Sequence, residues 1–272
     1  MNKIVVITGA SSGIGFATLQ QLVSEGHTVY GAGRRQEDMD KIEVAGGKPL
    51  QLEMTDYKSL EKAVKYVHRS EGKIDVLFNN AGYGLYGSVE DTPIDQAKHQ
   101  FDVNLFGLAR LTQLVLPYMR ESGSGTIINT SSMGGKMYTP LGAWYHATKH
   151  ALEGWSDCLR LELKEFGINV VILEPGGIQT PWGHKAAENI RKISSNGPYR
   201  NIGKTTADNT LSNYEKPGSL SPPTVIAKTV SKAISAHRPK TRYVAGKYAR
   251  PLIFIRKHFG DRVFDRIIMS SR

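Results

Sequence analysis

The stretch KIVVITGASSGIGFATLQQLVS, residues 3–24, decides the fold of this chain. It opens with an apolar run typical of a buried strand and closes with a helical pattern, and three glycines lie between them. Gly9 permits a tight turn, whereas Gly13 and Gly15 allow the backbone to approach a pyrophosphate and to pack against the strand. The N-terminus of the following helix offers free N–H groups to phosphates. The sequence therefore predicts a dinucleotide-binding strand, turn and helix rather than an ordinary turn.

The end of the second predicted strand, residues 27–32, indicates which dinucleotide is bound. An acidic residue there contacts a ribose 2′-hydroxyl, whereas an arginine accommodates a 2′-phosphate. This chain has Gly33, Arg34 and Arg35 at that place. We therefore expect NADP(H), with Arg34 as the main contact. A role as solvated surface charge stays open, more for Arg35 than for Arg34.

Strands and helices continue to alternate along the chain, which predicts a parallel sheet with helices on both faces. We expect an α/β fold with a doubly wound, mostly parallel, Rossmann-type sheet in a single domain, residues 1–272. The expected strands are 48–52, 74–79, 126–130, 169–174 and 242–245, and the expected helices are 36–44, 57–71 after Asp56 as N-cap, 92–120 with Pro93 at the first helical position, Tyr145 to 166, and 221–236.

The stretch WYHATK, residues 144–149, contains a candidate catalytic pair. Tyr145 and Lys149 stand four residues apart, so they lie on the same face of a helix. An ammonium close to a phenol favours the phenolate and lowers the pKa of tyrosine toward the working range of a general acid or base. An ordinary amphipathic helix with an exposed lysine is the alternative.

Polar positions beyond strand ends extend this site, because ligands bind at the carboxyl edge of open α/β sheets. Ser132 follows the strand 126–130. The NNAG turn, residues 79–82, would let backbone lie against a flat ligand, and the PGGIQT loop, residues 175–180, leaves the strand 169–174. Asn104 lies inside a predicted helix, where it is either a surface residue or part of a bend that holds a water.

Two segments toward the C-terminus have separate interpretations. Residues from about 183 to 220 are polar with weak periodicity, so we expect an irregular substrate lid within about 177–220. A basic amphipathic extension occupies about 246–272. Its stretch 251–269 alternates apolar residues with Arg and Lys, as an interfacial membrane helix does, but packing on its own domain or on a partner subunit is the more common use of such a helix.

Composition limits the function classes. The formal net charge is +10, but the basic residues are spread and no nucleic-acid-binding motif accompanies them, so anionic small ligands or an acidic membrane surface are favoured over DNA. Cys158 is the single cysteine, which excludes an intramolecular disulfide or cysteine metal cluster; we expect it to be packed and expect no metal site. No apolar run is long enough to span a bilayer, so a cytoplasmic protein is expected, and peripheral contact with a membrane stays open.

These motifs, in their order and spacing, resemble the short-chain dehydrogenase/reductase family over nearly the whole chain, especially NADP-dependent members of the hydroxysteroid and retinol dehydrogenase kind. The resemblance implies that Tyr145 is the catalytic acid or base and that Ser132 hydrogen-bonds the substrate oxygen. It implies that Lys149 lowers the tyrosine pKa and binds the nicotinamide ribose, and that Asn104 holds a water. Thr148 replaces the serine commonly found before the lysine.

The resemblance also implies a cofactor-binding set. Glu53 stands where aspartate usually contacts the adenine amine, a conservative departure with Met54 beside it. The implied residues are Gly9, Ser11, Ser12, Gly13, Ile14, Gly15, Arg34, Arg35, Glu53, Met54, Asn80, Ala81, Gly82, Asn104, Tyr145, Lys149, Pro175, Gly176, Ile178 and Thr180.

Together these features predict an oxidoreductase that transfers a hydride between NADP(H) and an alcohol/carbonyl substrate. Trp182, Ile178, Tyr138 and Leu141 indicate a hydrophobic pocket for that substrate. A dinucleotide-binding sensor or scaffold is the alternative, since fold does not imply function. The family resemblance also implies a homodimer or homotetramer, formed through the helices around Asn104 and after Tyr145.

Overall fold

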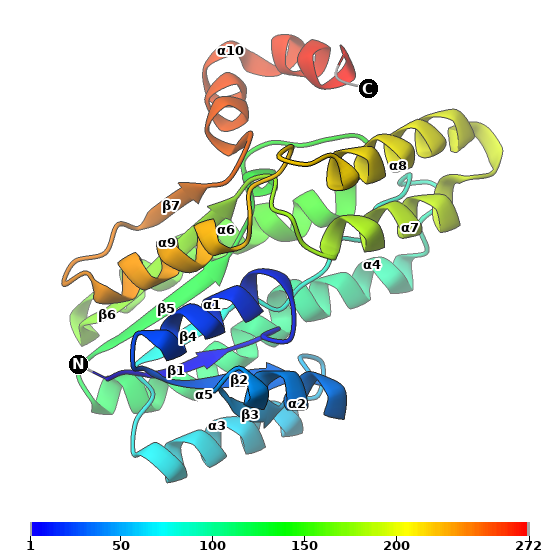
Figure 1. Ribbon diagram of the computed structural model, residues 1–272. Helices are drawn as coiled ribbons and strands as arrows, with labels where there is room; N and C mark the ends of the chain where they lie inside the picture. The colour runs from blue at the N-terminus through cyan, green and yellow to red at the C-terminus, as the bar shows by residue number, and fades with distance from the viewer. Residues whose placement is uncertain (1, 271–272) are drawn as a thin grey trace.

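In the computed structural model, which describes residues 2–270, a single seven-stranded sheet forms the centre of the molecule (Figure 1). Every pair of neighbouring strands in this sheet is parallel, in the order β3-β2-β1-β4-β5-β6-β7. The strands are β1 (Ile4–Ile7), β2 (Thr28–Gly33), β3 (Lys48–Gln51), β4 (Val76–Asn79), β5 (Gly125–Thr130), β6 (Ile168–Pro175) and β7 (Arg242–Ala245).

Different helices cover the two faces of the sheet, because successive side chains of a strand point to opposite faces. On β1, Ile4 and Val6 join one hydrophobic cluster, and Val5 and Ile7 join another. The first cluster includes side chains of α3 (Tyr57–Glu71), α5 (Leu108–Glu121) and α6 (Ala143–Glu162), and the second those of α1 (Gly13–Ser24), α2 (Gln36–Val44) and α9 (Thr224–Ser235). The predicted doubly wound Rossmann-type sheet is confirmed.

The strand order reverses at β1, which lies between β2 and β4. After β1 the chain continues to β2 and β3 on one side, and it then crosses back to β4 on the other side of β1. The connections that leave β1 and β4 therefore run in opposite directions at the carboxyl edge of the sheet. Such a switch point is the usual ligand position in a doubly wound sheet. The glycine turn after β1 and the NNAG turn after β4 meet there.

The helix predicted at 92–120 is interrupted. It consists of α4 (Ile94–Phe101), a π-helical turn (Asp102–Gly107) and α5, and Pro93 is the N-cap residue instead of the first helical residue. A side-chain carbon on Gly107 would collide with the carbonyl oxygen of Met54. The absence of a side chain at Gly107 thus lets the π-helical turn approach the chain beyond β3. The same turn places Asn104 in a buried position.

The segment expected to be an irregular lid is helical. It forms α7 (Trp182–Ser194) and α8 (Arg200–Glu215), which lie side by side in Figure 1 and are joined through a short 3₁₀ turn (Gly197–Tyr199). The prediction was wrong because small residues at this contact, Ala187, Gly203 and Ala207, contribute little to a hydrophobic pattern. A side-chain carbon on Gly203 would collide with the backbone of Ser194, so the close approach depends on glycine.

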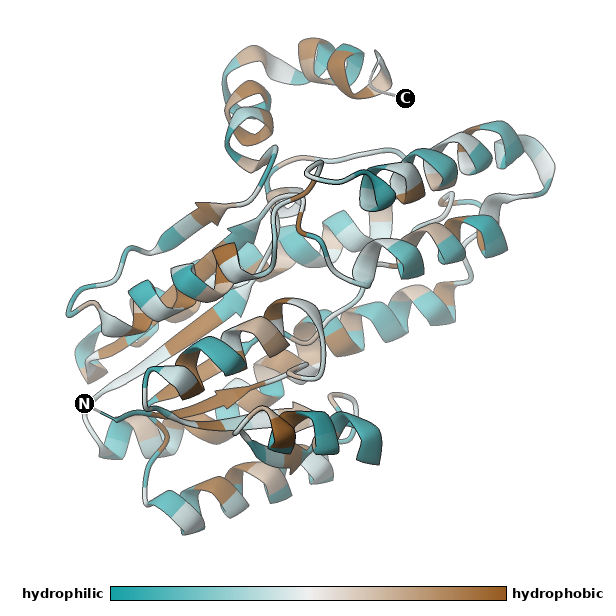
Figure 2. Ribbon diagram, in the orientation of Figure 1, coloured by the Kyte–Doolittle hydropathy of each residue, from teal (hydrophilic) through white to brown (hydrophobic). Residues whose placement is uncertain are grey.

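The C-terminal extension forms α10 (Ala249–Ser270), which lies beyond β7 at the edge of the molecule in Figure 1. Gly260, at φ +73°, bends it into two helical limbs. Figure 2 shows apolar and polar residues alternating along both limbs. The last two residues of the predicted extension, 271 and 272, lie outside the described part of the chain.

Two further findings concern predictions from composition. Cys158 is exposed on α6, so the expectation that it packs in the interior was wrong; its neighbour Leu159 takes the buried position instead. Across residues 2–270, the helices are all too short or too polar to cross a bilayer.

Candidate active site

The glycine turn after β1 is held in a conformation that needs glycine. Gly9 and Gly13 have φ values of +64° and +53°, and a side-chain carbon on Gly15 would collide with the carbonyl oxygen of Gly9. Thr8, which the sequence reasoning missed, joins this turn to the NNAG turn. Its Oγ1 accepts hydrogen bonds from the backbone N–H groups of Asn80 (3.0 Å) and Ala81 (2.9 Å).

Asn80 serves the turn through its side chain. Its amide nitrogen Nδ2 donates to the carbonyl oxygens of Thr8 (3.1 Å) and Gly9 (3.3 Å). A side-chain carbon on Gly82 would lie 3.0 Å from Asn104 Oδ1, so the NNAG turn also touches the catalytic candidates. The sequence-predicted residues of both turns therefore lie together at the switch point.

The N-terminus of α1 fits a pyrophosphate. Its N-cap residue, Ser12, makes no capping hydrogen bond through its side chain, and no acidic residue occupies the first turn. The first N–H groups of a helix have no intrahelical partner, and the helix dipole favours an anion there. Gly13, Ile14 and Gly15 supply this first turn, so the residues present fit the phosphates of a dinucleotide.

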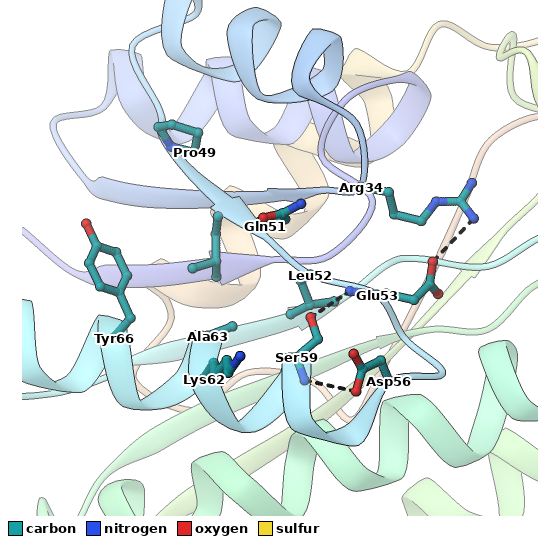
Figure 3. A pocket seen from close by; sticks show the side chains of 11 residues that line it. Arg34, Pro49, Gln51, Leu52, Glu53, Asp56, Ser59, Lys62, Ala63 and Tyr66 are labelled. Carbon is teal, nitrogen blue, oxygen red and sulfur yellow. Dashed lines mark hydrogen bonds and ion pairs between the residues drawn. The ribbon is translucent and has the colours of Figure 1, made fainter.

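A cavity of about 580 Å³ lies along the edge strand β3 and helix α3, and one end of it reaches the residues that follow β2 and β3 (Figure 3). Arg34 and Glu53 meet at its rim, with 3.6 Å between the guanidinium NH1 and the carboxylate Oε2. Both side chains are exposed, at 70% and 39%, so the ion pair is weak and the guanidinium can turn toward an anion. This arrangement could hold the adenosine end of a dinucleotide.

Arg35 forms an ion pair within the protein. Its Nε and NH2 donate to the carboxylate of Asp38 at 3.1 and 3.0 Å, and this contact holds the pKa of Asp38 down to about 2. The Asp38 side chain also bonds Ser11. Asp38 is buried beside Gly33, where the sequence shows no acidic residue at the strand end, and Arg35 neutralises it.

Met54 and Ile178 are core residues. Met54 is 5% exposed within the cluster on one face of the sheet, and Ile178 is 4% exposed within the cluster on the other. Any contact with a cofactor would come from their backbone. A sequence pattern does not show whether a residue contacts a cofactor through its backbone or through its side chain.

The PGGIQT loop brings Thr180 to the glycine turn. A side-chain carbon on Gly13 would lie 3.1 Å from Thr180 Cγ2, so the two segments are in contact across the switch point. Pro175 is the buried last residue of β6, and Gly176 donates its N–H to the carbonyl oxygen of Ala245 on β7 (2.8 Å). These two residues position the loop that presents Thr180.

Tyr145 and Lys149 lie on one face of α6, as predicted. The Nζ of Lys149 donates to the carbonyl oxygen of Thr130 at the end of β5 (2.7 Å) and lies 5.9 Å from the centroid of the Tyr145 ring. Ser132 follows β5 and hydrogen-bonds Tyr145. Its Oγ also accepts from the N–H of Gly134 (3.0 Å), which fixes the side chain at the start of a 3₁₀ turn (Met133–Gly135).

Asn104 is buried and joins two other segments. Its Nδ2 donates to the carbonyl oxygen of Tyr83 (2.9 Å) and to Thr148 Oγ1 (3.2 Å), and its Oδ1 accepts from the N–H of Tyr83 (3.1 Å). Thr148 thus supplies the hydroxyl expected of a serine at this position. The interpretation of Asn104 as a surface residue was wrong, and a role in holding a water stays a prediction.

The pKa values of the pair do not follow the sequence argument. Burial raises the pKa of Tyr145 to about 12, although the hydrogen bond with Ser132 acts in the opposite direction. Burial lowers the pKa of Lys149 to about 8, against the attraction of Glu153. The expected lowering of the tyrosine pKa by Lys149 is not seen, because desolvation of both groups outweighs an interaction across 5.9 Å.

Aromatic side chains from other segments enclose Tyr145. The ring centroids of Tyr86 and Trp182 lie 5.5 and 5.4 Å from that of Tyr145. Tyr214 of α8 packs closely against Gly183 of α7 and hydrogen-bonds Thr180. Tyr86 and Tyr214 were missed by the sequence reasoning, because their distance along the chain from Tyr145 gives no pattern. Aromatic rings therefore pack around the buried side chain of Tyr145.

His146, the residue after Tyr145, fixes the loop that carries Ser132. Its Nδ1 donates to the carbonyl oxygen of Gly134 (2.9 Å), and its Nε2 accepts from the N–H of Thr139 (3.0 Å). This pattern requires the neutral ring, and burial lowers the pKa of His146 to about 4. The sequence analysis did not identify His146, because its hydrogen-bond partners lie 7 and 12 residues away in the chain.

The fold and this site define a dinucleotide-binding protein with a buried tyrosine, a lysine and a serine at the carboxyl edge of its sheet. Residues 3–191 match the family model described as short chain dehydrogenase. The chain belongs to the short-chain dehydrogenase family of oxidoreductases, which bind nicotinamide dinucleotides.

Relatives cover the whole chain. The probable short-chain type dehydrogenase/reductase VdlC of Helicobacter pylori is 38% identical, over 99% of this chain and 98% of its own. The NADPH-dependent 3-dehydrocapnine reductase of Ornithobacterium rhinotracheale is 34% identical, over 99% and 97%. Among solved structures, a short-chain dehydrogenase from Streptomyces avermitilis has a TM-score of 0.80 at 30% identity, with all of both chains covered.

Proposed function

We propose that this protein reduces a hydrophobic ketone or aldehyde with NADPH, or oxidises the corresponding alcohol with NADP⁺, using Tyr145 as general acid or base. The observation that carries this proposal is the hydrogen-bonded pair Ser132 and Tyr145, with Lys149 on the same helix face, inside an aromatic enclosure. A sensor or scaffold that only binds a dinucleotide has no use for this buried arrangement.

The residues divide the proton chemistry between them. In reduction, the Tyr145 hydroxyl gives its proton to the carbonyl oxygen, and Ser132 donates a hydrogen bond to the same oxygen. Lys149 lies on the side of Tyr145 where its ammonium stabilises the phenolate that forms. The nicotinamide, when bound, supplies or accepts the hydride.

The preference for NADP(H) rests on Arg34. Its guanidinium is exposed at the end of β2, and only a weak ion pair with Glu53 holds it. The 3-dehydrocapnine reductase relative, which is NADPH-dependent by its name, supports the same choice. Arg35 contributes indirectly by neutralising Asp38.

The aromatic enclosure favours an apolar substrate. Tyr86 and Trp182 pack beside the Tyr145 ring, and their own rings stand 5.6 Å apart. Burial of a polar substrate group without a hydrogen-bond partner would be unfavourable there. A compound of the hydroxysteroid or retinoid kind fits this class, as the sequence resemblance implied.

A screen for NADPH oxidation against ketones and aldehydes graded by size and polarity tests the proposal. We expect turnover to rise with the apolar area of the substrate, and we expect Tyr145→Phe to remove it. Binding of NADPH without oxidation of any compound in the panel would favour the sensor or scaffold.

We also propose a homodimer or homotetramer, located in the cytoplasm. An apolar groove of about 530 Å³ lies between α4, the π turn and α6. Phe106 and Ile94 are 50% and 56% exposed on its walls, beside the indole of Trp144. Exposed apolar residues that gather in this way are typical of an interaction surface, and a second copy of the chain would cover them.

A further inference from the structure

The C-terminal helix α10 has an inner face that contacts the rest of the protein around Tyr138. Phe264 is completely buried, with its ring centroid 5.2 Å from that of Tyr138, and the Tyr138 hydroxyl donates to the carboxylate of Asp265 (2.8 Å). The guanidinium of Arg256 lies over the Tyr138 ring and forms an ion pair with Asp261 (2.7 Å). Both carboxylates of the helix therefore have partners within the protein.

The outer face of α10 is exposed and carries large apolar side chains among its polar ones. Phe254 and Phe259 are each 56% exposed. The centroids of their two rings lie 6.2 Å apart. Val263 and Met269 add 38% and 52% exposed side chains on the second limb. Packing of the helix on its own domain explains Phe264 but leaves these side chains in water.

Cations accompany this outer face. The helix contains five Lys and Arg residues and two Asp residues. Within residues 2–270, four of the cations form no ion pair: Arg250, Lys257, Arg262 and Arg266. Exposed aromatic residues beside unpaired cations are the composition of a helix that lies in the headgroup region of a bilayer.

We propose that α10 docks this protein on an anionic lipid surface, with Phe254 and Phe259 inserted among the headgroups and the four cations paired with lipid phosphates. The complementary charge of such a surface favours it over a second copy of the same cationic helix, which would bring like charges together. Because Tyr138 lies between Ser132 and Tyr145 in the chain, α10 is packed on the segment that joins the two catalytic candidates. Docking would hold that segment next to the lipid surface.

The test is cosedimentation of the full-length protein with phosphatidylcholine vesicles, with and without phosphatidylglycerol, at low and high salt. We expect binding only to the anionic vesicles, and weaker binding at high salt because surface charges are screened. Phe254→Ser with Phe259→Ser should weaken binding roughly tenfold or more, since the apolar insertion is lost. Lys257→Gln with Arg262→Gln should weaken it roughly fivefold for each cation removed.

Matched control variants distinguish loss of the α10 site from a general loss of surface apolar area or positive charge. Val44→Ser with Leu161→Ser removes apolar residues that are 89% and 65% exposed elsewhere, and Lys228→Gln with Lys232→Gln removes two cations from α9. Both control proteins should bind as the wild type does. Circular dichroism and thermal unfolding of every variant check that the fold is intact.

Three outcomes would overturn the proposal: no binding of the wild type to anionic vesicles at low salt, equal binding of the α10 variants and the wild type, or equal weakening by the control pairs. A change in sedimentation coefficient caused by the phenylalanine variant, without vesicle binding by the wild type, would assign the face to a second copy instead. None of these measurements depends on turnover, so they are independent of the proposed activity.

Discussion

Thr148 Oγ1 lies 3.2 Å from Asn104 Nδ2 and accepts a hydrogen bond from it, which ties the catalytic helix α6 to the π turn between α4 and α5. Both side chains are buried, and the threonine hydroxyl also donates to the carbonyl oxygen of Tyr145 (2.8 Å). The residue that departs from the family pattern therefore makes the hydrogen bonds that hold the helix of Tyr145 and Lys149 in place.

Thr148→Val should lower the free energy of unfolding by about 1–3 kcal/mol, because it leaves an N–H of the buried Asn104 amide without a partner in a site of almost unchanged volume. Turnover should fall as well, since the position of α6 is less well fixed. Urea unfolding and steady-state kinetics measure the two effects. Thr148→Ser keeps the hydroxyl and should retain more stability and more turnover than Thr148→Val. Equal losses in the two variants would contradict a role of the hydroxyl in positioning α6.

Tyr145→Phe should abolish turnover while NADPH binding stays nearly intact, because the change removes the proton donor and little packing volume. General acid–base catalysis contributes about 10² to 10⁴-fold. Tyr86→Phe is the matched control, since it removes a hydroxyl from the ring 5.5 Å away, and it should keep measurable turnover. Near-normal activity of the Tyr145 variant would remove this residue from the mechanism.

Arg34→Ala should weaken NADPH binding by roughly ten- to a hundredfold and barely alter NADH binding, since a charge-assisted hydrogen bond contributes about 1.5–3 kcal/mol. Glu53→Gln should do the opposite and tighten NADPH binding by up to about fivefold, because it releases Arg34 from an exposed ion pair. Dissociation constants from fluorescence titration measure both. Equal affinity of the wild type for NADH and NADPH would overturn the assignment.

Gly33→Asp, the exchange that the sequence suggests for turning the preference toward NADH, is a poor test in this protein. A side-chain carbon on Gly33 would lie 2.8 Å from the Cβ of Asp38, so helix α2 would have to move. We expect loss of stability instead of a clean change of cofactor, and thermal unfolding of this variant measures it.

His146 makes the fold sensitive to acid. Its pKa is lowered from 6.5 to about 4, so the unfolded chain takes up the proton more readily than the folded one. The neutral His146 ring therefore contributes about 3 kcal/mol to the free energy of unfolding above pH 6.5. This contribution is lost as the pH falls from 6.5 through about 4. His146→Gln should flatten the decline in the free energy of unfolding over this range. A variant that declines as steeply as the wild type would exclude the histidine as its cause.

Phe106→Asp should shift the assembly toward the monomer, because it places a charge in the apolar groove beside Trp144. Sedimentation velocity at micromolar concentration measures the change, and Tyr66→Asp, at a residue 56% exposed on α3, is the control. A wild type that sediments only as a 30.0 kDa monomer would count against the proposed homo-oligomer.

Local patterns predicted the parts of the site that lie within one turn or helix. The spacing of Tyr145 and Lys149 fixes a shared helix face, and the three glycines between strand and helix fix the phosphate turn. Such features depend on the periodicity of neighbouring residues, which a sequence displays directly.

Contacts between distant segments could not be predicted in this way. Asp38 comes to Gly33 only because α2 folds back on β2, and Trp182 reaches Tyr145 only because α7 crosses the site. The pKa values depend on the same tertiary burial, so charge spacing along one helix gave the wrong direction for Tyr145. The helices α7 and α8 were missed because small side chains form their interface.

That small-residue interface has a consequence for motion. The hydrophobic cluster that joins α7 and α8 to the rest of the protein has four buried members, Leu141, Ala187, Ile190 and Ala207, and is separate from the two large clusters of the sheet. Segments with few buried apolar contacts open locally at a lower free energy than global unfolding requires. We therefore expect the helix pair beside Tyr145 to open at a lower free energy than the sheet and its dinucleotide turn.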